Sequence, residues 1–141
     1  MGPLDREIGQ SYQLNITAKD GGRNSLSGSM LLSISVLDIN DNPPVFNSGG
    51  QYYAKVNESV TPGSYVIKVR ADDKDVGDNS RLSYSIISNS VISDQFNIDE
   101  ETGVITTNKP LKCKENICNV VVVAKDHGSP KKHPRPTLRF N

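Results

Sequence analysis

Apolar and polar residues alternate with a period of two along much of this chain. In the segment QSYQLNITA, Tyr12, Leu14 and Ile16 alternate with polar neighbours, and SMLLSISVLD repeats the pattern. Successive side chains of a β-strand point to opposite faces of a sheet, whereas an amphipathic helix repeats every 3.6 residues. The alternation predicts half-buried strands, and no segment has the pattern of a helix of three turns.

Four further segments have the same character, namely YVIKVRA, RLSYSI, QFNID and GVITT. The first of them is expected to place Tyr65 on the same apolar face as Ile67 and Val69. Gly, Asn, Asp, Ser and Pro separate the segments, and Glu101–Gly103 predicts a turn before GVITT. Short strands at this spacing predict an all-β sandwich or barrel.

An internal echo indicates tandem domains. NITAKDGG at 15–22 resembles VVVAKDHG at 121–128, at an offset of 106 residues. We therefore expect domains of about one hundred residues, the ordinary size range. Residues 1–42 would be the back part of one domain, and residues 43–141 most of the next, cut off inside its last strand. DINDNPP lies at the boundary, where two prolines stiffen a linker.

The charge balance excludes several partners. Sixteen Lys and Arg residues balance sixteen Asp and Glu residues, so no basic field attracts nucleic acid or anionic lipid. The longest apolar run, VVVVA, is far too short to span a membrane. The start of the chain lacks the features of a signal peptide. Segments outside this chain would have to provide secretion or membrane anchoring.

Acidic and amide side chains cluster at the strand ends, in LDRE, DINDN, DDKDVGDN and AKDHG. Oxygen-only clusters favour Ca²⁺ or Mg²⁺ over zinc or copper, and several contributing loops favour Ca²⁺, whose geometry is looser. The segment that begins at Asp73 lacks the glycine at position 6 and the glutamate at position 12 of an EF-hand loop. It must borrow metal ligands from elsewhere in the chain.

The motifs LDRE, AKDGG, DINDNPPVF, ADDKDVGDN, FNIDEETGVITT and AKDHGSP, in this order, resemble the extracellular repeats of the cadherin superfamily. The resemblance covers nearly the whole chain. The double glycine at 21–22 is more similar to protocadherin, Fat or Dachsous repeats than to classical cadherins. The resemblance implies seven-stranded Greek-key sandwiches joined end to end, with up to three Ca²⁺ ions at each junction.

The resemblance also implies a ligand set for each ion. Two ions would be bound by Asp5, Glu7, Asp38, the backbone of Ile39, and Asp41. The third would be held by Asn40, Asn42, Asp73, Asp75, Asn79 and Asp126, with Asn42 and Asn79 contributing backbone carbonyls and Asp75 bridging two ions. The third set is complete, whereas the first repeat lacks a glutamate that the family places in its first strand. Without cations the seven carboxylates repel one another, so calcium should turn a hinge into a rod. The affinity typical of extracellular modules is about 10⁻⁴–10⁻³ M, so occupancy implies a calcium-rich compartment.

Two regions depart from the family pattern. An isolated half repeat exposes an apolar face and unpaired strand edges, so residues 1–35 are expected to be poorly ordered alone. In the second repeat, LKCK places Lys112 and Lys114 where LDRE has carboxylates. The next junction is therefore expected to bind fewer ions or none.

The sequence leaves three alternatives for its two cysteines. Cys113 and Cys118 enclose KENI and could form a disulfide, stay as free thiols, or bind metal with His127 and His133. Extracellular context favours the bridge, and the histidine spacing is unlike that of zinc sites.

The sequons NIT and NES make Asn15 and Asn57 candidate N-glycosylation sites.

Together with the oxygen-rich clusters, the resemblance implies a calcium-dependent cell-adhesion protein at the cell surface, anchored by segments outside this chain. Its expected partners are other cadherin ectodomains, in homophilic or heterophilic pairs, and neither nucleic acid nor a small-molecule substrate. Catalysis is not expected, since no nucleophile motif or phosphate-binding loop occurs. The alternative is a β-sandwich protein-interaction module that does not need calcium. Calcium removal should lower stability in the first case only.

Overall fold

The structure is a computed structural model that describes residues 4–57, 59–87, 92–113 and 117–129. The chain divides into two compact units, Met1–Ile39 and Asn40–Asn141, which are described separately below. Within the described residues the regular elements are strands and short 3₁₀ turns, and no α-helix is present. The all-β prediction is confirmed. The last strand expected from the sequence falls in residues 130–141, outside the described part.

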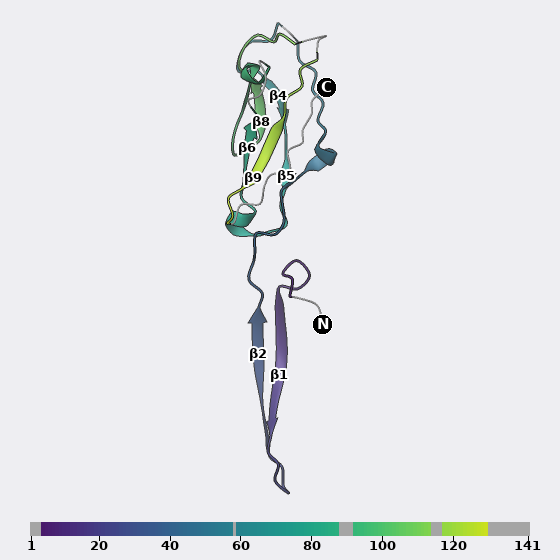
Figure 1. Ribbon diagram of the computed structural model, residues 1–141, viewed down its shortest axis with the longest axis vertical. Coiled ribbons are helices and arrows are strands. Elements are labelled where there is room, and N and C mark those ends of the chain that lie inside the picture. The colour runs from purple at the N-terminus through teal and green to yellow at the C-terminus, as the bar shows by residue number, and fades with distance from the viewer. Residues whose placement is uncertain (1–3, 58, 88–91, 114–116, 130–141) are drawn as a thin grey trace. The chain divides into compact units, whose positions relative to one another are not determined.

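The first unit is a long antiparallel hairpin of two strands (Figure 1), β1 (Ser11–Lys19) and β2 (Ser27–Ser35). Leu14 faces Leu32 and Ile16 faces Met30, so the predicted apolar residues share one face. Leu14, Ile16 and Met30 nevertheless remain 48%, 44% and 59% exposed. The apolar face expected to lie uncovered does so in this unit.

The second unit contains the remaining strands, all paired antiparallel. β8 lies between β4 and β7, while β3 pairs with β5 and β6 pairs with β9. The strand bounds are β3 (Val45–Phe46), β4 (Tyr65–Lys68), β5 (Ala71–Asp72), β6 (Leu82–Ile86), β7 (Phe96–Ile98), β8 (Val104–Thr107) and β9 (Val122–Asp126). The 3₁₀ turns are η1 (Asn47–Gly50), η2 (Gly77–Asn79) and η3 (Ser93–Gln95).

One hydrophobic core holds these strands together. Its most buried members are Val69, Ile105 and Val122, which come from three separate parts of the unit. The Phe46 and Tyr84 rings contact each other with centroids 6.2 Å apart. Burying such side chains contributes roughly 1.5–3 kcal/mol each. The core therefore fixes the strands whose ends carry the candidate ligands.

The expected inward position of Tyr65 is wrong. Its side chain is 64% exposed, whereas Val66 and Ile67 both pack against the core. The pairing of β4 with β8 shifts register between Tyr65 and Ile67. A bulge of this kind puts two residues opposite one, and it interrupts the strict alternation on which the prediction relied.

The turn predicted at Glu101–Gly103 is confirmed, and Asp99 organises it. The Asp99 carboxylate accepts hydrogen bonds from the Thr102 hydroxyl at 2.7 Å and the Thr102 N–H at 2.8 Å. These bonds favour the charged form and lower the pKa of Asp99. Gly103 has a positive φ of 69°, and a Cβ there would collide with the Val69 carbonyl. Only glycine fits this corner.

Candidate metal centre

The oxygen-rich segments of the second unit come from three places in its sequence. Asn40 and Asn42 precede β3, Asp73 and Asp75 follow β5, and Asp126 ends β9. Because β3 pairs with β5, the residues before β3 lie beside those after β5. The strand pairing thus gathers donors that are far apart in sequence.

Asn40 and Asp126 form the centre of this group. Asn40 Nδ2 donates to Asp126 Oδ1 at 2.9 Å, across 86 positions of sequence. Both side chains are buried, each with 2% of its surface exposed. The Gly128 N–H donates to the same carboxylate oxygen at 3.0 Å. These neutral donors hold one oxygen of a buried carboxylate in place.

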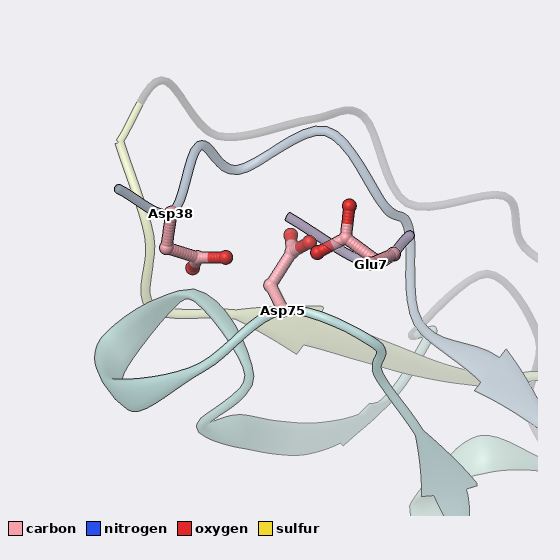
Figure 2. A group of neighbouring side chains, drawn as sticks. All are labelled: Glu7, Asp38 and Asp75. Atoms are coloured by element: carbon pink, nitrogen blue, oxygen red, sulfur yellow. The ribbon is translucent and has the colours of Figure 1, made fainter. Parts of the chain in front are cut away.

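Asn42 holds the second acidic residue, Asp75. The Asn42 N–H donates to Asp75 Oδ2 at 3.2 Å, and its Nδ2 donates to Asp75 Oδ1 at 2.7 Å. The same Nδ2 also donates to Asp41 Oδ1 at 2.9 Å. The Asp75 N–H in turn donates to Asp73 Oδ1 at 3.0 Å. Figure 2 shows the Asp75 side chain on the loop that follows β5.

The carboxylates of this group lie close enough to affect one another's charge. Burial raises the pKa of Asp73, and the negative charges of Asp75 and Asp126 raise it further. Hydrogen bonds from the backbone of Asp75 and Lys74 oppose these effects. The Asp73 carboxylate therefore ionises less readily than an isolated one.

Two buried carboxylate oxygens of this group have no hydrogen-bond partner. They are Oδ2 of Asp73 and Oδ2 of Asp126. A buried carboxylate oxygen without a donor carries a large desolvation cost, and such an atom calls for a counter-ion or equivalent. The surrounding side chains offer carboxylate and amide oxygens as metal ligands, the ligand type that Ca²⁺ prefers. The residues of this group fit a hard divalent cation.

Asn79 and Gly128 complete the surroundings. A Cβ placed on Gly128 would collide with Asn79 Oδ1 and would lie 2.6 Å from Asn40 Nδ2. The two asparagine side chains therefore meet over the bare backbone of Gly128. Gly128 was not predicted to have a role, although the glycine in AKDHG is visible beside Asp126 in the sequence.

The acidic residues of the first unit lie around a tight turn. Asp5 Oδ1 accepts the Glu7 N–H at 2.9 Å, and the Gly9 N–H donates to the Asp5 carbonyl at 2.9 Å. The Val36 N–H donates to the Gln10 carbonyl at 3.0 Å, which extends the strand pairing towards Asp38. The turn and the chain after β2 are thereby brought together.

Arg6 occupies the space between two of the predicted ligands. Its Nη2 lies 2.6 Å from Glu7 Oε1, and its Nε pairs with Asp38 Oδ1. Burial lowers the pKa of the Arg6 guanidinium, but bonding and attraction to Asp38 and Glu7 outweigh it, so that the pKa is raised. The Glu7 and Asp38 carboxylates, both drawn in Figure 2, have oxygens within 4.8 Å of each other. Arg6 was not predicted from the sequence to have a role.

The predicted ligands therefore fall into two groups, one inside each unit. Asn40, Asn42, Asp73, Asp75, Asn79 and Asp126 are brought together in the second unit, and Asp41 bonds to Asn42. Asp5, Glu7 and Asp38 surround the turn of the first unit. The side chain of Ile39 is 69% exposed, and the role of its backbone carbonyl stays a prediction.

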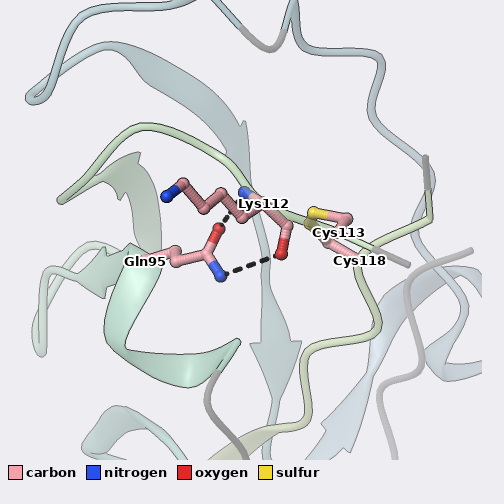
Figure 3. The surroundings of a disulfide bond; sticks show 4 residues. All are labelled: Gln95, Lys112, Cys113 and Cys118. Atoms are coloured by element: carbon pink, nitrogen blue, oxygen red, sulfur yellow. Dashed lines mark hydrogen bonds between the residues drawn. A yellow bond between two sulfur atoms is a disulfide. The ribbon is translucent and has the colours of Figure 1, made fainter. Parts of the chain in front are cut away.

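The two cysteines are five positions apart in the sequence. Their Cα atoms are 5.2 Å apart, inside the 4.4–6.8 Å that a disulfide spans, and the structure pairs them (Figure 3). Beside them, Gln95 Oε1 accepts the Lys112 N–H at 2.6 Å, and Gln95 Nε2 donates to the Lys112 carbonyl at 3.2 Å. Lys114 and His133 lie outside the described residues.

Both candidate glycosylation asparagines are exposed. Asn15 lies in the middle of β1. Asn57 Oδ1 accepts hydrogen bonds from the Ser59 N–H at 3.1 Å and the Ser59 hydroxyl at 2.9 Å. The asparagine and serine of that sequon therefore face each other.

Comparison with known proteins gives consistent matches. A family model described as "Cadherin domain" matches residues 52–141. "Protein dachsous" of Drosophila melanogaster is 42% identical over 130 residues, which are 91% of this chain and 4% of that protein. "Protocadherin alpha-6" of Homo sapiens is 38% identical over 130 residues, 90% of this chain and 14% of that protein. The chain thus spans a small part of these curated relatives.

A solved structure has the same fold. "Structure of mouse clustered PcdhgC3 EC1-3" matches with a TM-score of 0.86 and 34% sequence identity, over 98% of this chain and 45% of that one. Among the residues that the structure describes, no helix is both long and apolar enough to cross a membrane.

Proposed function

The chain belongs to the cadherin family, and on this premise we propose that it is a calcium-dependent spacer within a cell-adhesion ectodomain. Its fold is the all-β cadherin-like sandwich of its structural neighbours. Cadherin relatives are adhesion proteins and not enzymes, and the family generally binds Ca²⁺ between its repeats. The proposal concerns which residues of this chain hold the ion and what the ion does here.

One observation carries the proposal, namely the two buried oxygens of Asp73 and Asp126 that have no hydrogen-bond donor. They lie in a group whose other members also have oxygen atoms that can bind a metal ion. The proposed ligands in the second unit are Asn40, Asn42, Asp73, Asp75, Asn79 and Asp126. Bound Ca²⁺ would supply positive charge to oxygens that hydrogen bonding leaves unsatisfied.

The remaining ligands belong to the first unit and the linker. We assign Asp5, Glu7, Asp38, the backbone of Ile39, and Asp41 to further calcium ions, up to three in all. Residues 1–42 then form the end of one repeat with its linker, and residues 43–141 form most of the next repeat, up to a point inside its last strand. Calcium shared by linker and repeats would replace repulsion between carboxylates by cross-links, and would stiffen the ectodomain.

The proposal also includes the partners and the cellular compartment of the parent protein. Other cadherin ectodomains are the proposed partners, the parent protein is membrane-anchored, and the repeats lie outside the cell. A Cys113–Cys118 disulfide and glycans on Asn15 and Asn57 suit that compartment. Lys112, which stands where the first repeat has an acid, supports weaker calcium binding at the following junction.

Calcium titration tests the proposal. We expect wild-type protein to bind Ca²⁺ by calorimetry, with Kd near 10⁻⁴–10⁻³ M, and to gain about 1.4–2.7 kcal/mol per site in 10 mM Ca²⁺. Addition of a chelator should then lower Tm by several degrees. Asp126→Asn keeps the shape and one acceptor oxygen for Asn40 but removes the charge, so most of this stabilisation should disappear.

Asp94→Asn provides the matched control. Asp94 is exposed in the same unit, where its carboxylate lies 3.7 Å from Lys109 Nζ. This variant should titrate like wild type. The proposal fails if neither calorimetry nor Tm responds to Ca²⁺ in wild-type protein, and the calcium-independent interaction module would then be the better account.

A further inference from the structure

Arg6 holds two acidic side chains of the first unit at once. Its Nη2 contacts Glu7 Oε1 at 2.6 Å, and its Nε pairs with Asp38 Oδ1. The Arg6 and Asp38 side chains keep only 10% and 12% of their surface exposed. Ion pairs shielded from water in this way are stronger than fully exposed ones.

The acids of the second unit are held differently. Asp126 accepts from the Asn40 amide and the Gly128 N–H, and Asp75 accepts from the backbone and side chain of Asn42. These donors are neutral. A divalent cation that reaches them displaces no charge, whereas at Glu7 and Asp38 it meets a guanidinium already in place.

A guanidinium and a calcium ion compete for the same carboxylates. Ca²⁺ binds carboxylate oxygens at 2.3–2.6 Å. If it uses the oxygens that face Arg6, it must displace the guanidinium. If it uses the other oxygen of each carboxylate, the two cations lie close together and repel. Either route weakens calcium binding at these two side chains.

We propose that Arg6 is a built-in competitor of calcium, which clamps Glu7 and Asp38 in the calcium-free protein and raises the calcium concentration needed to engage them. The identity of the competing ion rests on the proposed function. In the absence of calcium, Arg6 then holds both acids around the turn and balances one of their two negative charges. Calcium must either displace Arg6 or bind beside its positive charge, so this half of the ligand set fills at higher calcium than the second-unit group.

The test follows carboxylate carbon-13 NMR shifts during a calcium titration of the whole chain. Shifts of Glu7 and Asp38 report the first group, and shifts of Asp73 and Asp126 report the second group in the same sample. In wild-type protein the Arg6 Nε–Hε signal should move with the same midpoint as Glu7, because calcium either displaces the guanidinium or binds close to it. This measurement needs no variant.

Arg6→Gln removes the charge and keeps an amide nitrogen that reaches as far along the side chain as the arginine Nε. We expect the Glu7 and Asp38 midpoint to fall roughly tenfold in calcium concentration, equivalent to about 1.4 kcal/mol. The Asp73 and Asp126 midpoint should stay within a factor of two. Arg6→Lys, which keeps the charge, should titrate near wild type. Arg23→Gln, which removes an exposed arginine from the same unit, should leave both midpoints unchanged.

The outcomes separate the two proposals. If the Glu7 and Asp38 midpoint stays put or rises in Arg6→Gln, while Asp73 and Asp126 still respond to calcium, the competitor role is wrong and the proposed function stands. The competitor role is equally wrong if Glu7 and Asp38 respond in neither protein. If none of the four carboxylates responds in wild type, the proposed function fails and the competitor role with it.

Discussion

At the scale of single residues, the sign of a charge effect depends on whether calcium is present. Asp73 Oδ2 is buried without a donor, and burial together with Asp75 and Asp126 raises its pKa. A carboxyl group whose pKa is raised on folding stabilises the fold only when protonated. Stability without calcium is therefore lost as pH rises from the unfolded value, about 3.9, through the raised folded value.

Asp73→Asn tests this reasoning. The variant keeps an oxygen for the Asp75 N–H and removes the buried charge. Without calcium at pH 7 we expect it to be more stable than wild type by roughly 1 kcal/mol, the usual scale for an unsatisfied buried group. In 10 mM calcium the order should reverse, because the variant lacks a ligand. Urea unfolding with and without chelator measures both.

The pH series supplies the control for that prediction. The stability difference between Asp73→Asn and wild type, without calcium, should shrink towards zero as pH falls below about 4, where the wild-type carboxyl is protonated in both states. A difference that stays constant with pH would show that the charge is not responsible.

At the scale of elements, one side chain supplies the backbone hydrogen bonds that a neighbouring strand would otherwise provide. Gln95 ends η3, is buried, and exchanges two hydrogen bonds with the backbone of Lys112 (Figure 3). Its backbone carbonyl also accepts the Asn108 N–H at 2.7 Å. Backbone groups that fold against a core need such partners. Gln95 therefore anchors the chain that leads from β8 to Cys113.

Gln95→Ala should destabilise the second unit by about 1–2 kcal/mol, because it leaves the Lys112 N–H and carbonyl without this partner. Hydrogen exchange at the Lys112 amide should become faster. Gln51→Ala is the matched control, since Gln51 is exposed and its side chain accepts a bond from the Tyr53 hydroxyl. Equal unfolding midpoints for the two variants would refute the anchoring role.

At the scale of the whole molecule, the two units differ in how much apolar surface they bury. Every residue of β1 is exposed, whereas β9 is mostly buried. An isolated two-stranded hairpin is marginally stable in water, and the second unit has a core that β1 and β2 lack. The expectation that residues 1–35 are poorly ordered alone follows from this contrast and stays a prediction.

Hydrogen exchange across the chain measures the contrast directly. We expect backbone amides of β1 and β2 to exchange at least roughly a hundredfold faster than those of β6 and β9, because local stability follows buried apolar contact. Leu14 and Met30 report the hairpin, and Tyr84 and Ala124 report the second unit. Comparable protection at all four amides would contradict the prediction.

The sequence alone predicted much of the fold because its signals are local. Alternation of apolar residues depends on neighbours two positions apart, and it located β1, β2, β6 and β8 to within three residues. The turn at Glu101–Gly103 followed from its residues in the same way. The bulge at Tyr65 was missed, because it depends on how β4 pairs with β8.

What the sequence by itself determined is the strand content and the list of oxygen donors; what only the tertiary structure decided is which of them meet. Asn40 reaches Asp126 across 86 positions, and Gly128 makes room for two asparagines. Arg6, which stands between the two acids of the LDRE motif, pairs with Glu7 and Asp38. Composition shows that such groups exist, but distance sets their interactions, and distance between remote residues is fixed by packing and strand register.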